Sequence, residues 1–79
     1  MERLQNLLLF LARSLVDEPE KVEVHAREED ARVELELQVA DGDVGKVIGR
    51  QGRVIKSLRS VCRASAAKLG KRVSVEVRD

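Results

Sequence analysis

Hydrophobic residues along this chain recur with two different spacings, and each spacing predicts one kind of element. Leucines three or four positions apart in residues 3–17 predict an amphipathic helix with one apolar stripe. A second helical pattern covers residues 53–69. The expected core stripe of the first helix is Leu4, Leu7, Leu8, Leu11 and Leu15. That of the second is Val54, Ile55, Leu58, Val61, Cys62, Ser65 and Leu69.

Apolar and polar residues alternate in three segments, 21–27, 32–39 and 71–78. Alternation with a period of two predicts half-buried strands. The first two segments are separated by the charged turn Glu28–Asp30 and are expected to form a hairpin. The residues expected to face the core are Val22, Val24, Ala26, Val33, Leu35, Leu37, Val39, Val73, Val75 and Val77.

Proline, glycine and aspartate positions complete the order of elements. Pro19 is expected to end the first helix, and Gly70 to terminate the last one. Asp43 is placed to cap a short helix over residues 44–48. The order is helix–strand–strand–helix–helix–strand, or α-β-β-α-α-β. It predicts an α+β fold in which residues 1–79 form a single domain, with helices packed on one face of a three-stranded sheet.

The net charge of +1 conceals a separation of charge along the chain. Residues 1–40 hold 5 basic and 10 acidic residues, whereas residues 41–79 hold 10 basic and 4 acidic ones. From Val44 to Arg72 no acidic residue occurs. A solvated helix face would normally mix the two signs. The basic half therefore favours a polyanionic partner, and the acidic half a different task.

Two glycines, Gly49 and Gly52, bracket two polar residues between the short helix and the long one. Glycine permits positive φ and lets another backbone approach closely. The helix that follows begins with free N–H groups and a partial positive charge, which suit a phosphate. Four cationic side chains surround the same point, Lys46, Arg50, Arg53 and Lys56. These features indicate a clamp for a phosphate backbone.

The segment Val47–Arg53 resembles the signature of KH domains, in which a GXXG loop clamps about four nucleotides of a single strand. The element order is similar to the bacterial, type II arrangement, and the whole chain resembles the small single-KH proteins of the KhpA family. The first loop position in that family is often Lys; Arg50 keeps the charge, so we expect binding to be retained. The resemblance implies single-stranded RNA as the ligand of Lys46, Ile48, Gly49, Arg50, Gln51, Gly52, Arg53 and Lys56.

The resemblance also implies an apolar groove for the bases between the loop helices and the adjacent strand. Its candidate lining residues are Val33, Leu35, Val44, Val47, Ile48, Val54 and Ile55, several of which are also expected in the core. The chain has no Trp or Tyr. Single-strand binding modules that stack bases on aromatic side chains are therefore disfavoured.

A KH domain contacts few nucleotides, and linking two such modules raises avidity through effective concentration. The resemblance accordingly implies a homodimer, or pairing with a larger KH protein of the KhpB type, in RNA chaperoning or post-transcriptional regulation. Leu9 and Phe10 point away from the predicted stripe and are either incidental exposure or a partner surface. Two alternatives stay open: a KH-shaped protein-interaction module without RNA binding, and a ribosome-assembly factor.

Other kinds of chemistry find little support in the sequence. His25 is expected on a polar strand face without metal-ligand spacing around it. Cys62 lies on a core stripe, where a buried thiol is inert. We expect no enzyme, no metal and no cofactor. The chain has no run of eighteen apolar residues, so no membrane span is expected, and a single cysteine favours the cytoplasm.

Overall fold

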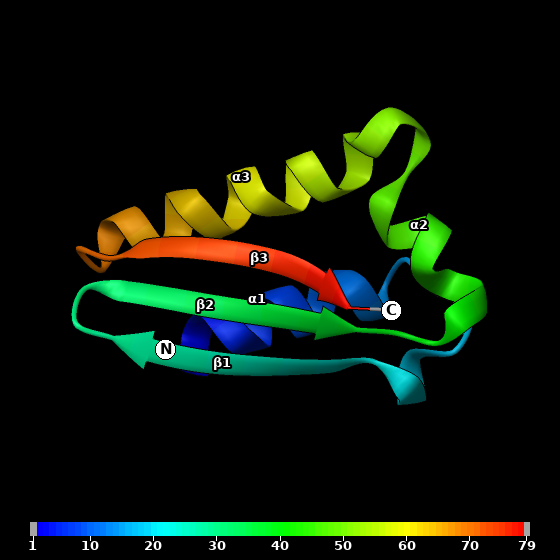
Figure 1. Cartoon of the computed structure of the whole chain (residues 1–79), viewed down its shortest axis with the longest axis horizontal. Coiled ribbons are helices and arrows are strands. Elements are labelled where there is room, and N and C mark those ends of the chain that lie inside the picture. The colour runs from blue at the N-terminus through cyan, green and yellow to red at the C-terminus, as the bar shows by residue number, and fades with distance from the viewer. Residues whose placement is uncertain (1, 79) are drawn as a thin grey trace.

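The predicted order of elements is present in the computed structural model, which describes residues 2–78. Figure 1 shows the sheet in front, with α1 crossing behind it and α3 running along its edge. Within the described residues, no helix is long and apolar enough to cross a membrane. The elements are α1 (Glu2–Arg13), β1 (Glu23–Glu29), β2 (Arg32–Gln38), α2 (Val44–Ile48), α3 (Arg53–Lys68) and β3 (Arg72–Arg78).

The three strands form one sheet in the order β1-β2-β3. Strand β2 lies in the middle. It pairs antiparallel with its hairpin partner β1 on one side and parallel with β3, which follows α3 in the chain, on the other. Glu29 still pairs with Arg32, which makes the hairpin turn shorter than predicted. Asp30 adopts a φ of 55° there, a conformation that Asp tolerates better than most residues. The first strand accordingly lies over Glu23–Glu29, two residues later than the alternating pattern predicted.

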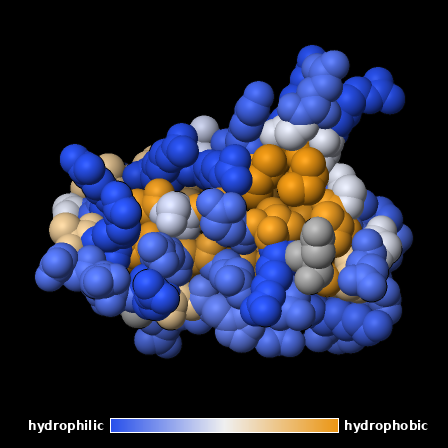
Figure 2. Space-filling model, in the orientation of Figure 1, coloured by the Kyte–Doolittle hydropathy of each residue, from blue (hydrophilic) through white to orange (hydrophobic). Residues whose placement is uncertain are grey.

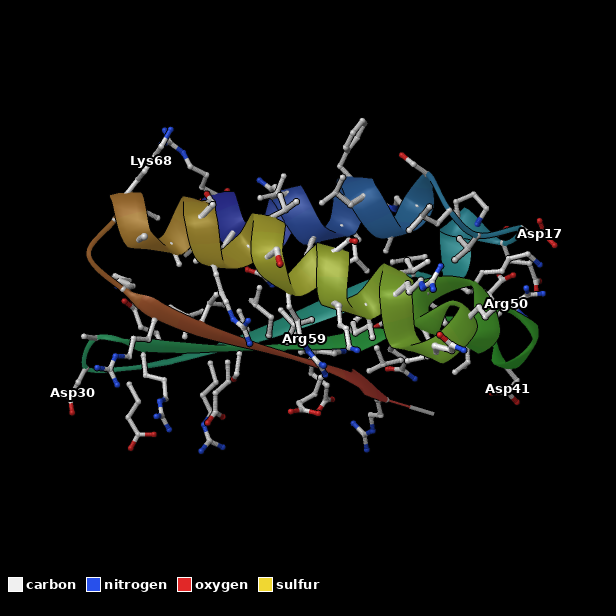
Figure 3. The ribbon with its side chains drawn as sticks, turned by 90° about the horizontal axis from the view of Figure 1, so that it is seen from above. Asp17, Asp30, Asp41, Arg50, Arg59 and Lys68 are labelled. Carbon is white, nitrogen blue, oxygen red and sulfur yellow. The ribbon has the colours of Figure 1, made fainter. Side chains whose placement is uncertain are left out.

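The core lies between the sheet and the helical layer. On the central strand the inward positions Val33, Leu35 and Leu37 are at most 1% exposed, as the alternation predicted. Figure 3 shows both long helices on one side of the sheet and charged side chains on the other. That arrangement confirms the expected fold, with helices covering one face only.

Helix α1 ends at Arg13 rather than at residue 17. The chain tightens after it: the Leu15 N–H donates to the Ala12 carbonyl at 3.0 Å, and the Ser14 hydroxyl to the Phe10 carbonyl at 2.8 Å. Leu15 therefore leaves the stripe on which it was expected and is 40% exposed. Its assignment to the core was wrong.

The buried side of each long helix differs from the predicted one, because small residues occupy close-packed positions on it. The fully buried row of α1 is Leu4, Leu8 and Ala12, and Leu9 packs half-buried on the core instead of pointing away. In α3, Ala66 is buried and Val61 is exposed, against the prediction; Leu69, just after the helix, is exposed as well. Rows spaced by four residues are ridges by which helices pack. The sequence pattern followed large apolar residues and missed both alanines.

Asp43 is a buried anchor and not a helix cap. It is 3% exposed, and its side chain makes no capping hydrogen bond to α2. Its carboxylate instead accepts the backbone N–H groups of Asp17 and Glu18, at 3.2 and 3.0 Å. Burial by itself raises the pKa of Asp43, but these two hydrogen bonds and the charge of Lys46 outweigh it and lower the pKa. Asp43 thereby fastens the α1–β1 connection to the start of α2.

Candidate nucleic-acid interface

The loop between α2 and α3 folds as a sharp turn built on three residues with positive φ. Helix α2 ends at Ile48, and Gly49 follows with φ 79° and ψ 169°. Gln51 and Gly52 have φ of 56° and 73°, and α3 begins at Arg53. The Gly52 N–H closes the turn on the Gly49 carbonyl at 3.1 Å. Figure 1 shows this turn projecting at one end of the molecule.

The two loop glycines are needed for different reasons. A Cβ at Gly49 would lie 2.8 Å from the backbone nitrogen of Val54 and would overlap the Val54 side chain. Its φ and ψ also fall in a region that only glycine populates readily. A Cβ at Gly52 would meet only the Ile55 side chain, at 3.8 Å. Gly49 is thus fixed by close packing and backbone strain, and Gly52 by its left-handed conformation alone.

The loop presents main chain and polar side chains to solvent. Arg50, Gln51 and Arg53 are exposed, whereas both glycines are half-buried. Figure 2 shows hydrophilic side chains projecting at this point, with apolar surface directly beneath them. A strand that lay against the turn would therefore meet side-chain donors and backbone in the same place.

The basic residues around the loop divide into paired and unpaired ones. Among residues 2–78, no carboxylate lies within 4 Å of the cationic groups of Arg50, Arg53 or Lys56. Lys46 differs from them: its ammonium donates to Asp17 at 2.7 Å and lies 3.5 Å from Asp43. The hydrogen bond to Asp17 and the charge of that carboxylate raise the pKa of Lys46. Lys46 lies beside the loop, and its ammonium group binds Asp17 of the α1–β1 connection.

Helix α3 continues the positive charge away from the loop along one side, which we call the basic flank: Lys56, Arg59 and Arg63. These residues are three and four positions apart and so share one side of the helix. The Arg59 Nε donates to the Val75 carbonyl of β3 at 3.1 Å. Arg63 lines a small hollow with Lys71, Arg72 and Val73. The basic flank therefore faces the edge strand β3, next to which Figure 3 places Arg59.

Four of the residues predicted to line a groove for the bases lie in the core instead. Val33, Leu35, Val47 and Ile55 are at most 5% exposed and lie in the core, so they are closed to a base. The strand beside α3 is β3, and not the central strand that carries Val33 and Leu35. The remaining candidates are half-buried and pack against the core: Val44, Ile48 and Val54.

An apolar hollow of about 400 Å³ lies on the other side of α3, between that helix and the end of α1. We call its apolar lining residues the apolar flank: Leu11, Leu15, Val54, Leu58 and Val61. Arg53, Ser14 and Ser57 complete the lining. Val61 is 45% exposed and Leu15 40% exposed. Phe10, one turn before Ser14 of the hollow's lining, is 68% exposed. The sequence pattern indicated Phe10 as a candidate partner contact but placed Leu15 and Val61 in the core. Most of this surface was therefore not predicted.

The comparison with protein families decides what kind of domain carries this loop. The model of the KhpA/KhpB KH domain matches residues 5–77. This chain belongs to the KhpA/KhpB family. The loop Gly49–Gly52 therefore stands in a KH domain, as its resemblance to the GXXG pattern indicated.

Relatives match over nearly their whole length. A protein of Clostridium acetobutylicum named RNA-binding protein KhpA is 47% identical over 74 residues, which is 94% of this chain and 99% of the relative. The Bacillus subtilis protein of the same name is 36% identical over 78 residues, 99% of this chain and 96% of the relative.

Among solved structures, that of Era in complex with MgGDPNP and nucleotides 1506–1542 of 16S ribosomal RNA has a similar fold. Its TM-score is 0.68 at 22% identity, over 94% of this chain and 28% of the Era chain. The likeness to Era is one of fold.

Outside the loop and its flanks, the described residues place His25 on the surface and Cys62 in the core. Among residues 2–78, no group of three or more His, Cys, Asp or Glu side chains could hold a metal ion. Cys62 is buried, and burial raises the pKa of its thiol. His25 is exposed beside Glu23 on the outer face of the sheet.

Proposed function

We propose that this protein binds single-stranded RNA at the Gly49–Gly52 loop, as a KH domain of residues 1–79. The backbone of the strand lies against the glycines, and Arg50, Gln51, Arg53 and Lys56 contact its phosphates and sugars. Ile48 supplies apolar contact to the first bases. The observation that carries the proposal is the exposed turn with three positive-φ residues, surrounded by arginines that have no carboxylate within 4 Å among residues 2–78.

Two further observations support RNA as the ligand. The relatives from C. acetobutylicum and B. subtilis are named RNA-binding proteins. The chain also lacks Trp and Tyr, so its recognition of bases relies on apolar and hydrogen-bonding contacts rather than stacking. In this proposal Lys46 is a positioning residue, because its charge is engaged by Asp17 and Asp43.

The biological role that fits such a clamp is RNA chaperoning or post-transcriptional regulation in the cytoplasm. A domain that grips about four nucleotides binds weakly by itself. We therefore propose that it acts as a pair with a second KH chain, either another copy or a larger KhpB-type protein. The apolar flank with the exposed Phe10 supports this, because an apolar hollow beside a projecting aromatic ring suits a protein contact.

The test is fluorescence anisotropy of a labelled, uridine-rich RNA octamer titrated with the protein. In the variant Arg50→Asp/Gln51→Asp, acidic side chains face the phosphates, and we expect binding to become unmeasurable. The wild-type affinity should fall with salt, with a logarithmic slope of about −2 for three neutralised phosphates.

A matched control separates the loop from net charge. The variant Arg3→Asp/Asn6→Asp makes the same change of charge on exposed positions of α1. Acidic residues near a helix N-terminus are well tolerated. We expect this variant to bind RNA within about threefold of wild type, a reduction that reflects long-range charge only. Equal losses in the two variants, or a wild-type affinity independent of salt, would refute the loop as the RNA site.

A further inference from the structure

One arginine of the basic flank is held differently from its neighbours. Arg59 is half-buried, and its Nε donates to the Val75 carbonyl on β3, one of the two edge strands of the sheet in the described residues. Lys56 and Arg63, one turn to either side, are exposed. A long side chain fixed through Nε loses much of its rotamer freedom before any ligand arrives.

The position of Arg59 relative to the loop follows from helix geometry. It lies seven residues after Gly52, or about two turns and 10 Å along α3, and therefore on the same side of the helix. A strand clamped at the loop and running along the basic flank would reach Arg59 within the few nucleotides that a KH domain contacts. Its phosphates are then next to Lys56, and a base is next to β3.

The chemistry of the fixed guanidinium points to a base and not to a phosphate. With Nε bound to a carbonyl, the two terminal nitrogens are left as a fork of parallel donors. Among residues 2–78 no carboxylate lies within 4 Å of them. Such a fork pairs with two adjacent acceptors. Cytosine offers O2 and N3, and guanine O6 and N7. In uracil and adenine, an N–H donor takes the place of one of these two acceptors: N3–H in uracil and the N6 amino group in adenine.

We propose that Arg59 is a specificity-determining residue, which selects cytosine or guanine over uracil and adenine at one position of the bound strand. The inference rests on the proposed RNA-binding function and adds a preference that the loop alone does not supply. Because loop contacts go to the backbone, they are the same for every base.

The experiment compares four RNA octamers of uridine whose two central positions are UU, CC, GG or AA, titrated by fluorescence anisotropy. Their charge and length are equal, so differences report the base alone. For wild type we expect CC and GG to bind about tenfold more tightly than UU and AA, the range of a bidentate arginine–base pair. Arg59→Lys keeps the charge and a donor for the Val75 carbonyl but loses the fork. It should bring all four octamers within about twofold of each other, near the wild-type affinity for UU.

Arg63→Lys is the matched control, since it makes the same change on an exposed residue one turn along the same flank. It should keep the tenfold preference. Arg59→Gln, which also retains a donor for the carbonyl, should behave as Arg59→Lys, and circular dichroism melts show that both variants fold. A preference that survives in both Arg59 variants, or is absent from wild type, overturns the role of Arg59. Failure of wild type to bind any octamer overturns the proposed RNA-binding function itself, and with it the selection by Arg59.

Discussion

The two flanks of α3 carry opposite chemistry on a single helix of 16 residues. Toward β3 the helix presents the basic flank, whose middle residue is fixed to the sheet edge. Toward α1 it presents the apolar flank around a hollow of about 400 Å³. A difference of two or five positions along a helix places side chains on opposite sides. Lys56 and Val61, or Arg59 and Val61, are separated in this way.

This difference would let so small a domain offer separate surfaces to the two proposed partners. Contacts on the basic flank are governed by counterion release and weaken with salt. Contacts on the apolar flank depend on removing hydrophobic area from water and persist in salt. We therefore expect the proposed RNA and protein partners to approach α3 from different sides and to share only its first turn, where Arg53 and Val54 line the hollow. Substitutions farther along each flank should remove one partner without the other.

Gly49 packs directly against Val54 of the apolar flank, and substitution there should have the largest effect. An alanine at Gly49 would collide with Val54 of the apolar flank in a backbone conformation that excludes side chains. We expect Gly49→Ala to lower the free energy of unfolding by about 3 kcal/mol. Gly52→Ala, which has room for its Cβ, should cost about 1 kcal/mol. Urea denaturation followed by circular dichroism measures both; equal losses would contradict the distinction between the two glycines.

A charge on the apolar flank should separate association from RNA binding. Val61→Glu places a carboxylate on the hollow, and we expect it to abolish any dimer seen by size-exclusion chromatography with light scattering, because an unpaired charge is costly at an apolar contact. The octamer affinity should stay within about twofold of wild type. Ala67→Glu, an exposed site of the same helix, serves as the control and should leave association intact. A wild-type protein that is monomeric at all concentrations would argue against self-association and leave a second KH protein as the partner.

The smallest expected effect concerns Asp43, which fastens the α1–β1 connection to the start of α2. Because the folded pKa of Asp43 is lowered, its stabilisation is present above the unfolded pKa of about 3.9 and is lost as pH falls through the folded value. Asp43→Asn should therefore lower the melting midpoint at pH 7 by roughly 5 °C, and the difference from wild type should shrink below about pH 4. Asp41→Asn, two residues earlier and exposed, should change little. A difference that stayed constant down to pH 2 would rule out the carboxylate as its source.

Much of this architecture could be read from the sequence, because its elements have strong periodic patterns. The alternation in β2 and β3 placed Val33, Leu35, Leu37 and Val75 in the core correctly. The short helix was predicted with the bounds that the structure shows, Val44–Ile48, because glycines lie just beyond it. Gly70, predicted to end α3, does so with φ 71°.

The parts that escaped prediction depend on contacts between distant segments. The role of Asp43 required knowing that residues 17 and 18 return to it, which no local pattern encodes. Ala12 and Ala66 were overlooked because a small residue signals close packing only when the neighbouring element is known. The bond of Arg59 to the Val75 carbonyl escaped prediction as well, because it depends on which strand lies beside α3 at the edge of the sheet.

The most direct test of the two flanks is an NMR titration of ¹⁵N-labelled protein with the unlabelled uridine-rich octamer. Binding at the loop and the basic flank predicts the largest amide shifts at Gly49–Arg53, with further shifts at Arg59 and along β3. Amides near Phe10, Leu15 and Val61 should stay within the noise. Shifts centred on the apolar flank, with the loop amides unchanged, would contradict RNA binding at the loop and the basic flank.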